Sequence, residues 1–240
     1  MNILITICAR GGSKGIPGKN IKRIVGKPLI EFTIATAIKF AEKNESKISI
    51  STDDETIKLA AENLGIKTQY KRPEYLATDS AGKSETIKDL LLYEESLNKV
   101  KYDYILDLDV TSPLRTLEDL ENAFEILKSN KDALNLFSVN DAARNPYFNM
   151  VEQNENGFYS IVKTNPDGSI MTRQSAPKVY DLNASFYWYR RSFFESNFKS
   201  ALTNKSLIYK MNHTCFDLDH PIDFLFMEYL LENNKLDFQL

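Results

Sequence analysis

A glycine-rich loop with a strong positive charge follows the first apolar run of the chain. Between Ile7 and Arg23 there are four glycines and no acidic residue. The five positive charges of this stretch belong to Arg10, Lys14, Lys19, Lys22 and Arg23. A buried strand that ends in such a loop presents backbone N–H groups and cations to an anion. The stretch therefore predicts a binding site for a small polyanion such as a triphosphate.

The loop differs from the two common phosphate-binding motifs. A Walker motif requires a glycine where this chain has Ser13, and a serine or threonine where it has Asn20. The dinucleotide motif Gly-x-Gly-x-x-Gly does not fit the glycines in any register. A solvent-exposed basic turn is the alternative interpretation. The position after the first strand favours a ligand site, because ligands of open α/β sheets bind at the carboxyl ends of strands.

Two Asp-x-Asp pairs could complement this loop. In extended chain, residues i and i+2 point the same way, so the two carboxylates of a pair can face one hard cation. The first pair, Asp107 and Asp109, ends a strand-like run, and the second, Asp217 and Asp219, precedes a helix-like segment. Taken alone, the second pair is more typical of a turn before Pro221. Together with the basic loop, the pairs indicate a site for a metal-bound triphosphate.

Length and composition narrow the class of protein. A chain of 240 residues that is 42% hydrophobic and 26% charged is long enough for one globular domain. The net charge of −3 argues against a general nucleic-acid partner. There is no apolar run of membrane-spanning length and no signal peptide, so we expect a cytoplasmic protein without a membrane partner. Cys8 and Cys215 have no disulfide or zinc spacing and are interpreted as buried thiols.

Predicted strands and helices alternate along most of the chain. Alternation at this spacing is typical of an α/β fold with a mostly parallel sheet and helices on both faces. We predict strands at 2–8, 47–52, 67–71, 102–110, 133–139, 183–190 and 207–212. We predict helices at 28–43, 54–64, 84–98, 116–129, 191–198 and 221–234.

The pattern changes over residues 140–181. No amphipathic helix is found there, and the turn sequence 153–157 separates two β-prone runs as in a hairpin. We predict an antiparallel arm inserted into a core made of 1–139 and 182–240. Because its apolar side chains need a partner surface, the arm predicts a homodimer.

Three further stretches complete a known pattern. Residues 51–54 read Ser-Thr-Asp-Asp, residues 72–79 read Arg-Pro-Glu-Tyr-Leu-Ala-Thr-Asp, and residues 110–115 read Val-Thr-Ser-Pro-Leu-Arg. With the basic loop, they closely resemble the acylneuraminate cytidylyltransferases, the CMP-sialic acid synthetases, from the first strand to the last helix. The resemblance implies a Rossmann-like nucleotidyltransferase core and a homodimer built through a protruding arm. It also implies transfer of CMP from CTP to the anomeric hydroxyl of a nine-carbon 2-keto acid sugar, with Mg²⁺ or Mn²⁺ as cofactor and pyrophosphate as the second product.

The resemblance assigns roles residue by residue. The nucleotide-binding positions are Ala9, Arg10, Gly11, Ser13, Lys14, Lys19, Asn20, Arg72, Ala81, Lys83 and Asp109. The sugar-binding positions are Asp109, Phe148, Arg173, Gln174, Asn183 and Tyr187. The metal ligands are Asp109, Asp217 and Asp219, and the catalytic positions are Arg10, Lys14, Lys19 and Asp217.

Two departures from the family pattern concern the sugar. Asp109-Val110 stands where neuraminate enzymes have Gln-Pro, and this aspartate resembles a metal ligand of the related Kdo cytidylyltransferases. Phe148 stands where sialic acid enzymes have a sugar-contacting lysine. Both changes favour a bacterial relative such as legionaminic acid over N-acetylneuraminate. The alternatives are a CMP-Kdo synthetase, a Mg²⁺-dependent glycosyltransferase with an Asp-x-Asp site, and a non-catalytic nucleotide-binding module.

Overall fold

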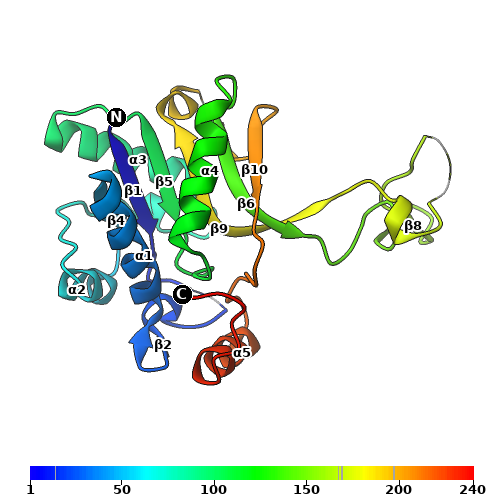
Figure 1. Ribbon diagram of the computed structural model, residues 1–240, viewed down its shortest axis with the longest axis horizontal. Coiled ribbons are helices and arrows are strands. Elements are labelled where there is room, and N and C mark those ends of the chain that lie inside the picture. Colours follow the sequence, from blue (N-terminus) through cyan, green and yellow to red (C-terminus); the bar gives the residue numbers. More distant parts are fainter. Residues whose placement is uncertain (14, 167, 169, 197) are drawn as a thin grey trace.

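A computed structural model gives the fold of the chain, described for residues 1–13, 15–166, 168, 170–196 and 198–240. These residues form a central six-stranded sheet in the order β10-β6-β9-β5-β1-β4 (Figure 1). The strands are β1 (Ile3–Cys8), β4 (Lys47–Ser51), β5 (Tyr104–Leu108), β6 (Asn135–Asp141), β9 (Tyr180–Arg190) and β10 (Ser206–Lys210). The predicted α/β fold with a mostly parallel sheet is confirmed.

The parallel direction of three strands brings the predicted site residues together at the carboxyl ends of these strands. β1 runs parallel to both β4 and β5, with Cys8 opposite Ser51 and Thr6 opposite Asp107. The carboxyl ends of these three strands therefore meet. β6 and β10 are also parallel, and β9 runs antiparallel between β5 and β6.

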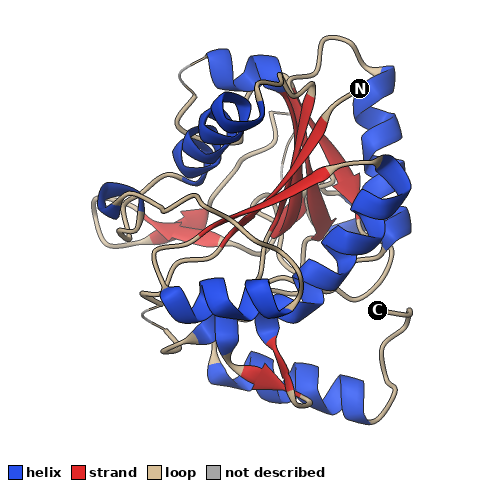
Figure 2. Cartoon of the chain, turned by 90° about the vertical axis from the view of Figure 1, so that its left-hand side faces the viewer, coloured by secondary structure: helices blue, strands red, loops and turns tan. Residues whose placement is uncertain are grey.

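Helices cover both faces of the sheet, as Figure 2 shows. Side chains alternate between the faces along each strand. Ile5 of β1 and Trp188 of β9 join the core on one face, whereas Leu4 and Tyr189 join the core on the other. The helices are α1 (Leu29–Asn44), α2 (Glu55–Asn63), α3 (Lys83–Asn98), α4 (Leu117–Ser129) and α5 (Pro221–Glu232).

Aromatic packing fixes β9 in the middle of the sheet. The Trp188 ring stacks on Phe124 of α4 at a centroid distance of 4.4 Å and lies 5.6 Å from Phe40 of α1. Its indole N–H donates to the Leu120 carbonyl at 3.1 Å. Because that N–H is satisfied, the fully buried indole adds apolar contact without an unpaired polar group.

Helix starts follow their sequence signals. The Asp54 side chain accepts hydrogen bonds from Thr56 N and Ile57 N at the start of α2. At the start of α4, Thr116 and Asp119 form a capping box. Short 3-10 helices occur at η1 (Lys19–Ile21), η2 (Glu74–Leu76), η3 (Arg173–Ser175) and η4 (Arg191–Glu195), and the last of these replaces the predicted helix at 191–198.

The predicted strand at 67–71 is wrong. In this stretch Thr68 Oγ1 accepts from Tyr70 N at 3.1 Å, a local bond that competes with strand pairing. Just beyond it, Arg72 N donates to Thr52 O at 3.2 Å. The segment runs past the end of β4 without joining the sheet.

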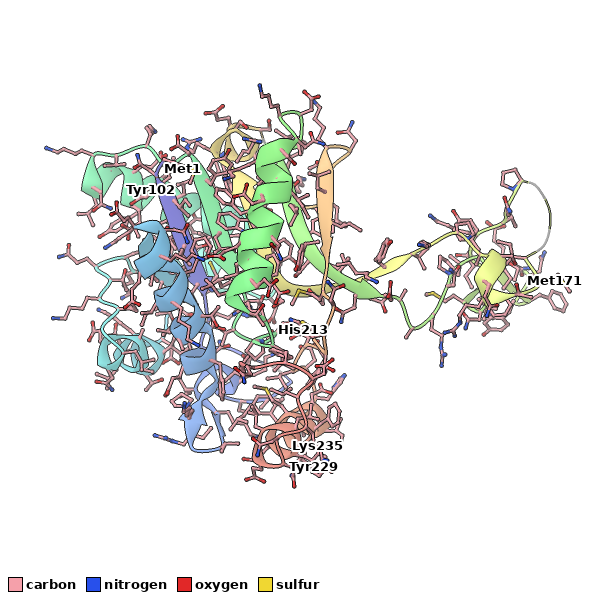
Figure 3. The ribbon with its side chains drawn as sticks, in the orientation of Figure 1. Met1, Tyr102, Met171, His213, Tyr229 and Lys235 are labelled. Carbon is pink, nitrogen blue, oxygen red and sulfur yellow. The ribbon has the colours of Figure 1, made fainter. Side chains whose placement is uncertain are left out.

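The chain between β6 and β9 extends away from the core (Figure 1). We call residues 142–179 the arm. Its hairpin pairs β7 (Val151–Gln153) with β8 (Tyr159–Ile161). Met171 lies at the far end of the molecule in Figure 3 and is 80% exposed, and Phe158 is 72% exposed. β6 and β9 still pair through Asp141 and Tyr180, just inside the predicted limits of 140–181.

Two short strands, β2 (Arg23–Ile24) and β3 (Lys27–Pro28), form a separate hairpin. In the described part of the chain, no helix has both the length and the apolar character needed to cross a membrane.

Candidate active site

Two adjoining pockets lie at the carboxyl ends of β1, β4 and β5. The first, of about 320 Å³, is lined by Cys8, Arg10, Ser13, Gly15, Lys19, Asn20, Asp109, Thr111 and Asp219. The second, of about 210 Å³, is lined by Cys8, Arg10, Arg72, Leu76, Thr78, Asp79, Ala81, Lys83 and Thr86. Because both pockets share Cys8 and Arg10, an elongated ligand can occupy them together. A larger hollow of about 580 Å³ between α3 and η4 contains none of the predicted site residues.

The basic loop is held in place by Asp53, which follows β4, and by Asn20 of the loop itself. Gly11 N donates to Asp53 Oδ1 at 3.1 Å, and Asn20 Nδ2 donates to the Arg10 carbonyl at 2.9 Å. A Cβ added at Gly11 would lie 2.6 Å from Asp54 Oδ2. Glycine at position 11 is therefore required for the loop to pack against the start of α2.

Two cations of the loop are paired with acids from distant segments. Arg10 Nη2 lies 2.7 Å from Asp79 Oδ1, and Lys19 Nζ lies 3.0 Å from Asp219 Oδ1. A bound polyphosphate could take over both cations, because it presents more negative charge than either carboxylate. Lys14, also predicted to bind the triphosphate, lies outside the described residues.

The end of β5 carries a carboxylate whose two oxygens are both engaged. Asp109 Oδ1 accepts from Thr111 N and Thr111 Oγ1, each at 2.9 Å. Asp109 Oδ2 accepts from Lys83 Nζ at 2.6 Å. Burial raises the pKa of Asp109, but Lys83 and the Thr111 hydrogen bonds outweigh burial and lower the pKa to about 2. The Asp109 carboxylate is therefore ionised throughout the neutral range.

The second acidic pair lies beside this strand end. Leu218 N donates to Thr111 O at 2.8 Å, which sets Asp217 and Asp219 next to β5. Asp217 Oδ1 is buried and has no hydrogen-bond partner among the described residues. Burial, together with the charges of Asp109 and Asp219, raises the pKa of Asp217. A buried carboxylate oxygen without a partner is stabilised by a cation.

The three predicted metal ligands are not gathered into one set. Among the described residues, no group of three or more His, Cys, Asp or Glu side chains is close enough to hold an ion. Mg²⁺ is commonly bound by one or two carboxylates together with phosphate oxygens of the substrate. The unpartnered oxygen of Asp217, with Asp219 nearby, fits that arrangement, whereas Asp109 is committed to Lys83 and Thr111.

Several predicted nucleotide-binding residues line the second pocket. Arg72 is buried, and its guanidinium donates to Ser51 Oγ at 2.8 Å and Ser51 O at 2.7 Å. Ala81 and Lys83 line the same pocket. Cys8 lines both pockets, and burial raises the pKa of its thiol, so the thiol stays protonated at neutral pH.

The predicted sugar residues are divided between the core and the arm. Tyr187 is buried under Lys83, whose Nζ lies 4.5 Å from the centre of the ring. Asn183 is buried at the root of the arm, where its Oδ1 accepts from Ser138 Oγ at 2.6 Å and its Nδ2 donates to Asn140 Oδ1 at 2.9 Å. The Asn183 amide is therefore hydrogen-bonded to other buried or partly buried side chains of the protein.

Three predicted sugar residues lie on the arm. Arg173 is exposed and its Nη2 donates to the Ala143 carbonyl at 3.4 Å, within the arm itself. Phe148 is half-buried and Gln174 is exposed. No described residue of the arm lines either pocket of its own chain.

Several residues that build the site had no predicted role. Asp79 pairs with Arg10, and Thr111 holds Asp109. Arg115, which is 1% exposed, donates to the Asp109 carbonyl at 2.8 Å and to Thr33 Oγ1 at 2.6 Å. Asp79 and Arg10, like Arg115 and Thr33, are distant along the chain, so only the fold could assign those two contacts. Thr111 lies two residues from Asp109, and its contact depends on the turn of the chain at the end of β5.

Comparison with known proteins adds a family and a fold. A family model described as Cytidylyltransferase matches residues 4–237. The CMP-N,N'-diacetyllegionaminic acid synthase of Campylobacter jejuni is 39% identical to this chain over 98% of it and 97% of the relative. The post-translational flagellin modification protein B of Campylobacter coli has the same identity and coverage. A solved CMP:2-keto-3-deoxy-manno-octonic acid synthetase, complexed with CTP, has a TM-score of 0.69 over 98% of this chain and 100% of that chain. At 17% identity, the last comparison shows the fold alone.

Proposed function

The chain belongs to the cytidylyltransferase family, and we propose that it transfers CMP from CTP to the anomeric hydroxyl of a nine-carbon 2-keto acid sugar. The observation that carries this proposal is the pair of adjoining pockets that share Arg10. One pocket has the cations of the basic loop facing Asp219, and the other has Arg72 and Ala81. In a nucleoside triphosphate, the triphosphate would match the pocket with the loop cations, and the base would match the pocket with Arg72 and Ala81.

The loop cations would exchange partners when CTP binds. In the proposed complex Arg10 leaves Asp79 and Lys19 leaves Asp219, and both donate to phosphate oxygens. Asn20, whose side chain holds the Arg10 carbonyl, keeps the loop in its shape during this exchange. Because Lys19 contacts Asp219 through Oδ1, this exchange would also free that oxygen for a cation.

A divalent ion, Mg²⁺ or Mn²⁺, fits beside the loop. We assign it to Asp217 and Asp219, because the buried Asp217 Oδ1 lacks a partner among the described residues. The ion would neutralise negative charge on the phosphate oxygens.

The transfer itself requires charge stabilisation by the chain. The anomeric oxygen forms a bond to the α-phosphorus, the bond from that phosphorus to the bridging oxygen breaks, and the hydroxyl proton is released. Negative charge then builds on the departing pyrophosphate, where Arg10 and Lys19 can donate to it. Loss of one such contact costs about 3 kcal/mol, which is about a hundredfold in rate.

We assign the acid sugar to the legionaminic acid type. The support is the 39% identity to a protein named CMP-N,N'-diacetyllegionaminic acid synthase, together with an aromatic Phe148 in the arm. An apolar wall suits a deoxygenated sugar that carries a methyl group. The planar guanidinium of Arg173 is a bidentate match for the sugar carboxylate.

A homodimer would bring the arm to a pocket. The arm residues Phe148, Arg173 and Gln174 line neither of the two adjoining pockets of their own chain, so we assign them to the pocket of a second copy. The exposed apolar side chains of the arm, such as Phe158 and Met171, would be covered in such a dimer. We place the reaction in the cytoplasm, where CTP is available.

The test is release of pyrophosphate from CTP with a panel of acid sugars. We expect N,N'-diacetyllegionaminic acid to support the fastest release and N-acetylneuraminic acid to support slower release. Release with Kdo alone would identify a CMP-Kdo synthetase instead. Hydrolysis of a sugar nucleotide without consumption of CTP would identify a glycosyltransferase.

A further inference from the structure

A lysine faces two carboxylates at the end of β5. Lys83 Nζ lies 2.6 Å from Asp109 Oδ2 and 3.1 Å from Asp107 Oδ2. Asp107 is fully buried and Asp109 is partly buried. Lys83 is the first residue of α3, so its side chain reaches β5 from outside the sheet. The ammonium therefore donates a hydrogen bond to Asp109 Oδ2 and forms an ion pair with Asp107 Oδ2, which has no hydrogen-bond partner among the described residues.

The other oxygen of each carboxylate is fixed by a hydroxyl or amide donor. Asp107 Oδ1 accepts from Thr6 Oγ1 at 2.8 Å, and Asp109 Oδ1 accepts from Thr111. These donors orient both side chains so that one oxygen of each remains for Lys83. A pair of carboxylates arranged in this way resembles a divalent-cation site, but here the position of the ion is taken by an ammonium group.

The local charges balance without a metal ion. Arg115 is fully buried and donates to the Asp109 carbonyl, close to the same carboxylates. Within the described residues of this cluster, Lys83 and Arg115 thus offset Asp107 and Asp109. The Lys83 ammonium also lies 4.5 Å from the centre of the Tyr187 ring, which favours a cation at that point. Burial opposes the charge on Lys83, but Asp109 and Asp107 hold its pKa well above the ordinary value.

We propose that Lys83 is a built-in cation that replaces a second divalent ion between Asp107 and Asp109, so that each chain binds a single divalent ion, at Asp217 and Asp219. Only the assignment of Asp217 and Asp219 as metal ligands rests on the proposed function. Lys83 also lines the second pocket, whereas Asp109 lines the first. The fixed cation therefore lies where the two pockets adjoin, and it needs no recruitment from solution.

The test counts Mn²⁺ ions bound to the substrate-free protein, by electron paramagnetic resonance of the free ion during titration. Lys83→Met removes the ammonium and leaves the two carboxylates facing each other. We expect this variant to bind one more Mn²⁺ per chain than the wild type. Lys83→Arg keeps the charge and should show no gain, and Lys83→Met combined with Asp109→Asn should lose the gain.

Equal Mn²⁺ stoichiometry in the wild type and a folded Lys83→Met variant would overturn the inference. Circular dichroism reports whether the variant folds. If it does not, the wild type alone decides: one Mn²⁺ per chain that is lost in Asp217→Asn but kept in Asp109→Asn supports the inference, and two Mn²⁺ per chain overturn it. Because the count needs neither CTP nor sugar, an extra ion in Lys83→Met would stand even if no transferase activity were found.

Discussion

Lys19 Nζ lies 3.0 Å from Asp219 Oδ1, although 200 residues separate them along the chain. The pair joins the loop after the first strand to the loop before the last helix. In the proposed reaction, Lys19 binds phosphate and Asp219 binds the cation that accompanies it. The ion pair thus holds together, before CTP arrives, the two groups that CTP would separate.

We expect Asp219→Asn to lower kcat/KM for CTP by about two orders of magnitude, because it keeps the side-chain volume but removes a charged ligand. Thermal unfolding should show a Tm close to that of the wild type, since Asp219 is mostly exposed. Asp132→Asn, an exposed change before β6, serves as the matched control. If Asp219→Asn keeps most of the activity, the aspartate belongs to the turn before α5 and not to the metal site.

Arg72→Lys should raise the KM for CTP while the KM for the sugar stays unchanged. Lysine keeps the charge but cannot make the paired contacts to Ser51 Oγ and Ser51 O that aim the guanidinium. Steady-state kinetics with each substrate varied in turn separate the two effects. Equal changes in both KM values would place Arg72 outside the base pocket.

Mixing two inactive variants tests whether the arm serves a partner's pocket. Arg173→Ala damages the arm, and Asp217→Asn damages the pocket. In a mixed dimer one of the two sites has both an intact arm and an intact pocket, so random mixing should restore about a quarter of the wild-type activity. No recovery after mixing, in chains shown by sedimentation equilibrium to be dimers, would contradict the shared site.

Legionaminic acid should have a kcat/KM about tenfold or more above that of N-acetylneuraminate, because one methyl-sized apolar contact gives about 1 to 3 kcal/mol. Phe148→Lys should narrow this ratio by weakening the apolar wall and adding a cation. Direct competition between the two sugars measures the ratio. A preference for N-acetylneuraminate in the wild type would show that Phe148 does not select the sugar.

The His213–Asp119 pair predicts a pH-dependent contribution to stability. His213 Nε2 lies 2.8 Å from Asp119 Oδ2, and the ring stacks on Phe238 at a centroid distance of 3.9 Å. Burial lowers the pKa of His213, but Asp119 outweighs burial and the net shift is upward. A raised pKa means that this stability is fully present below the unfolded value of about 6.5 and is lost as the pH rises through the folded value. The Tm difference between wild type and His213→Gln should therefore be larger at pH 6 than at pH 9. A constant difference would mean that the ion pair does not stabilise the fold.

Local sequence signals were sufficient for most of the core. Apolar runs and helix signals such as Pro28 and the Thr116–Asp119 capping box lie close together in the chain, so they could be interpreted without the fold. The strand predicted at 67–71 fails because the local Thr68–Tyr70 bond replaces strand pairing. The sequence of this segment does not show whether its backbone groups pair with the sheet or make local hydrogen bonds.

Fewer contacts of the candidate site than of the core could be predicted from the sequence. The basic loop and the Asp217–Asp219 pair could be identified from their residue types, and the fold brings them together. The engagement of Asp109 by Lys83 joins residues 26 positions apart and depends on how α3 meets β5. Arg173 was assigned to the sugar by resemblance and by the match of its guanidinium to a carboxylate, and in the structure it contacts only the Ala143 carbonyl of its own arm among the hydrogen bonds of the described residues.

Transfer of CMP to an acid sugar is tested by the mass of the product formed from CTP and N,N'-diacetyllegionaminic acid. We expect a CMP-sugar and one equivalent of pyrophosphate, with little product from UTP and none when EDTA removes divalent ions. Pyrophosphate without a CMP-sugar, or equal product formation in the presence of EDTA, would contradict it.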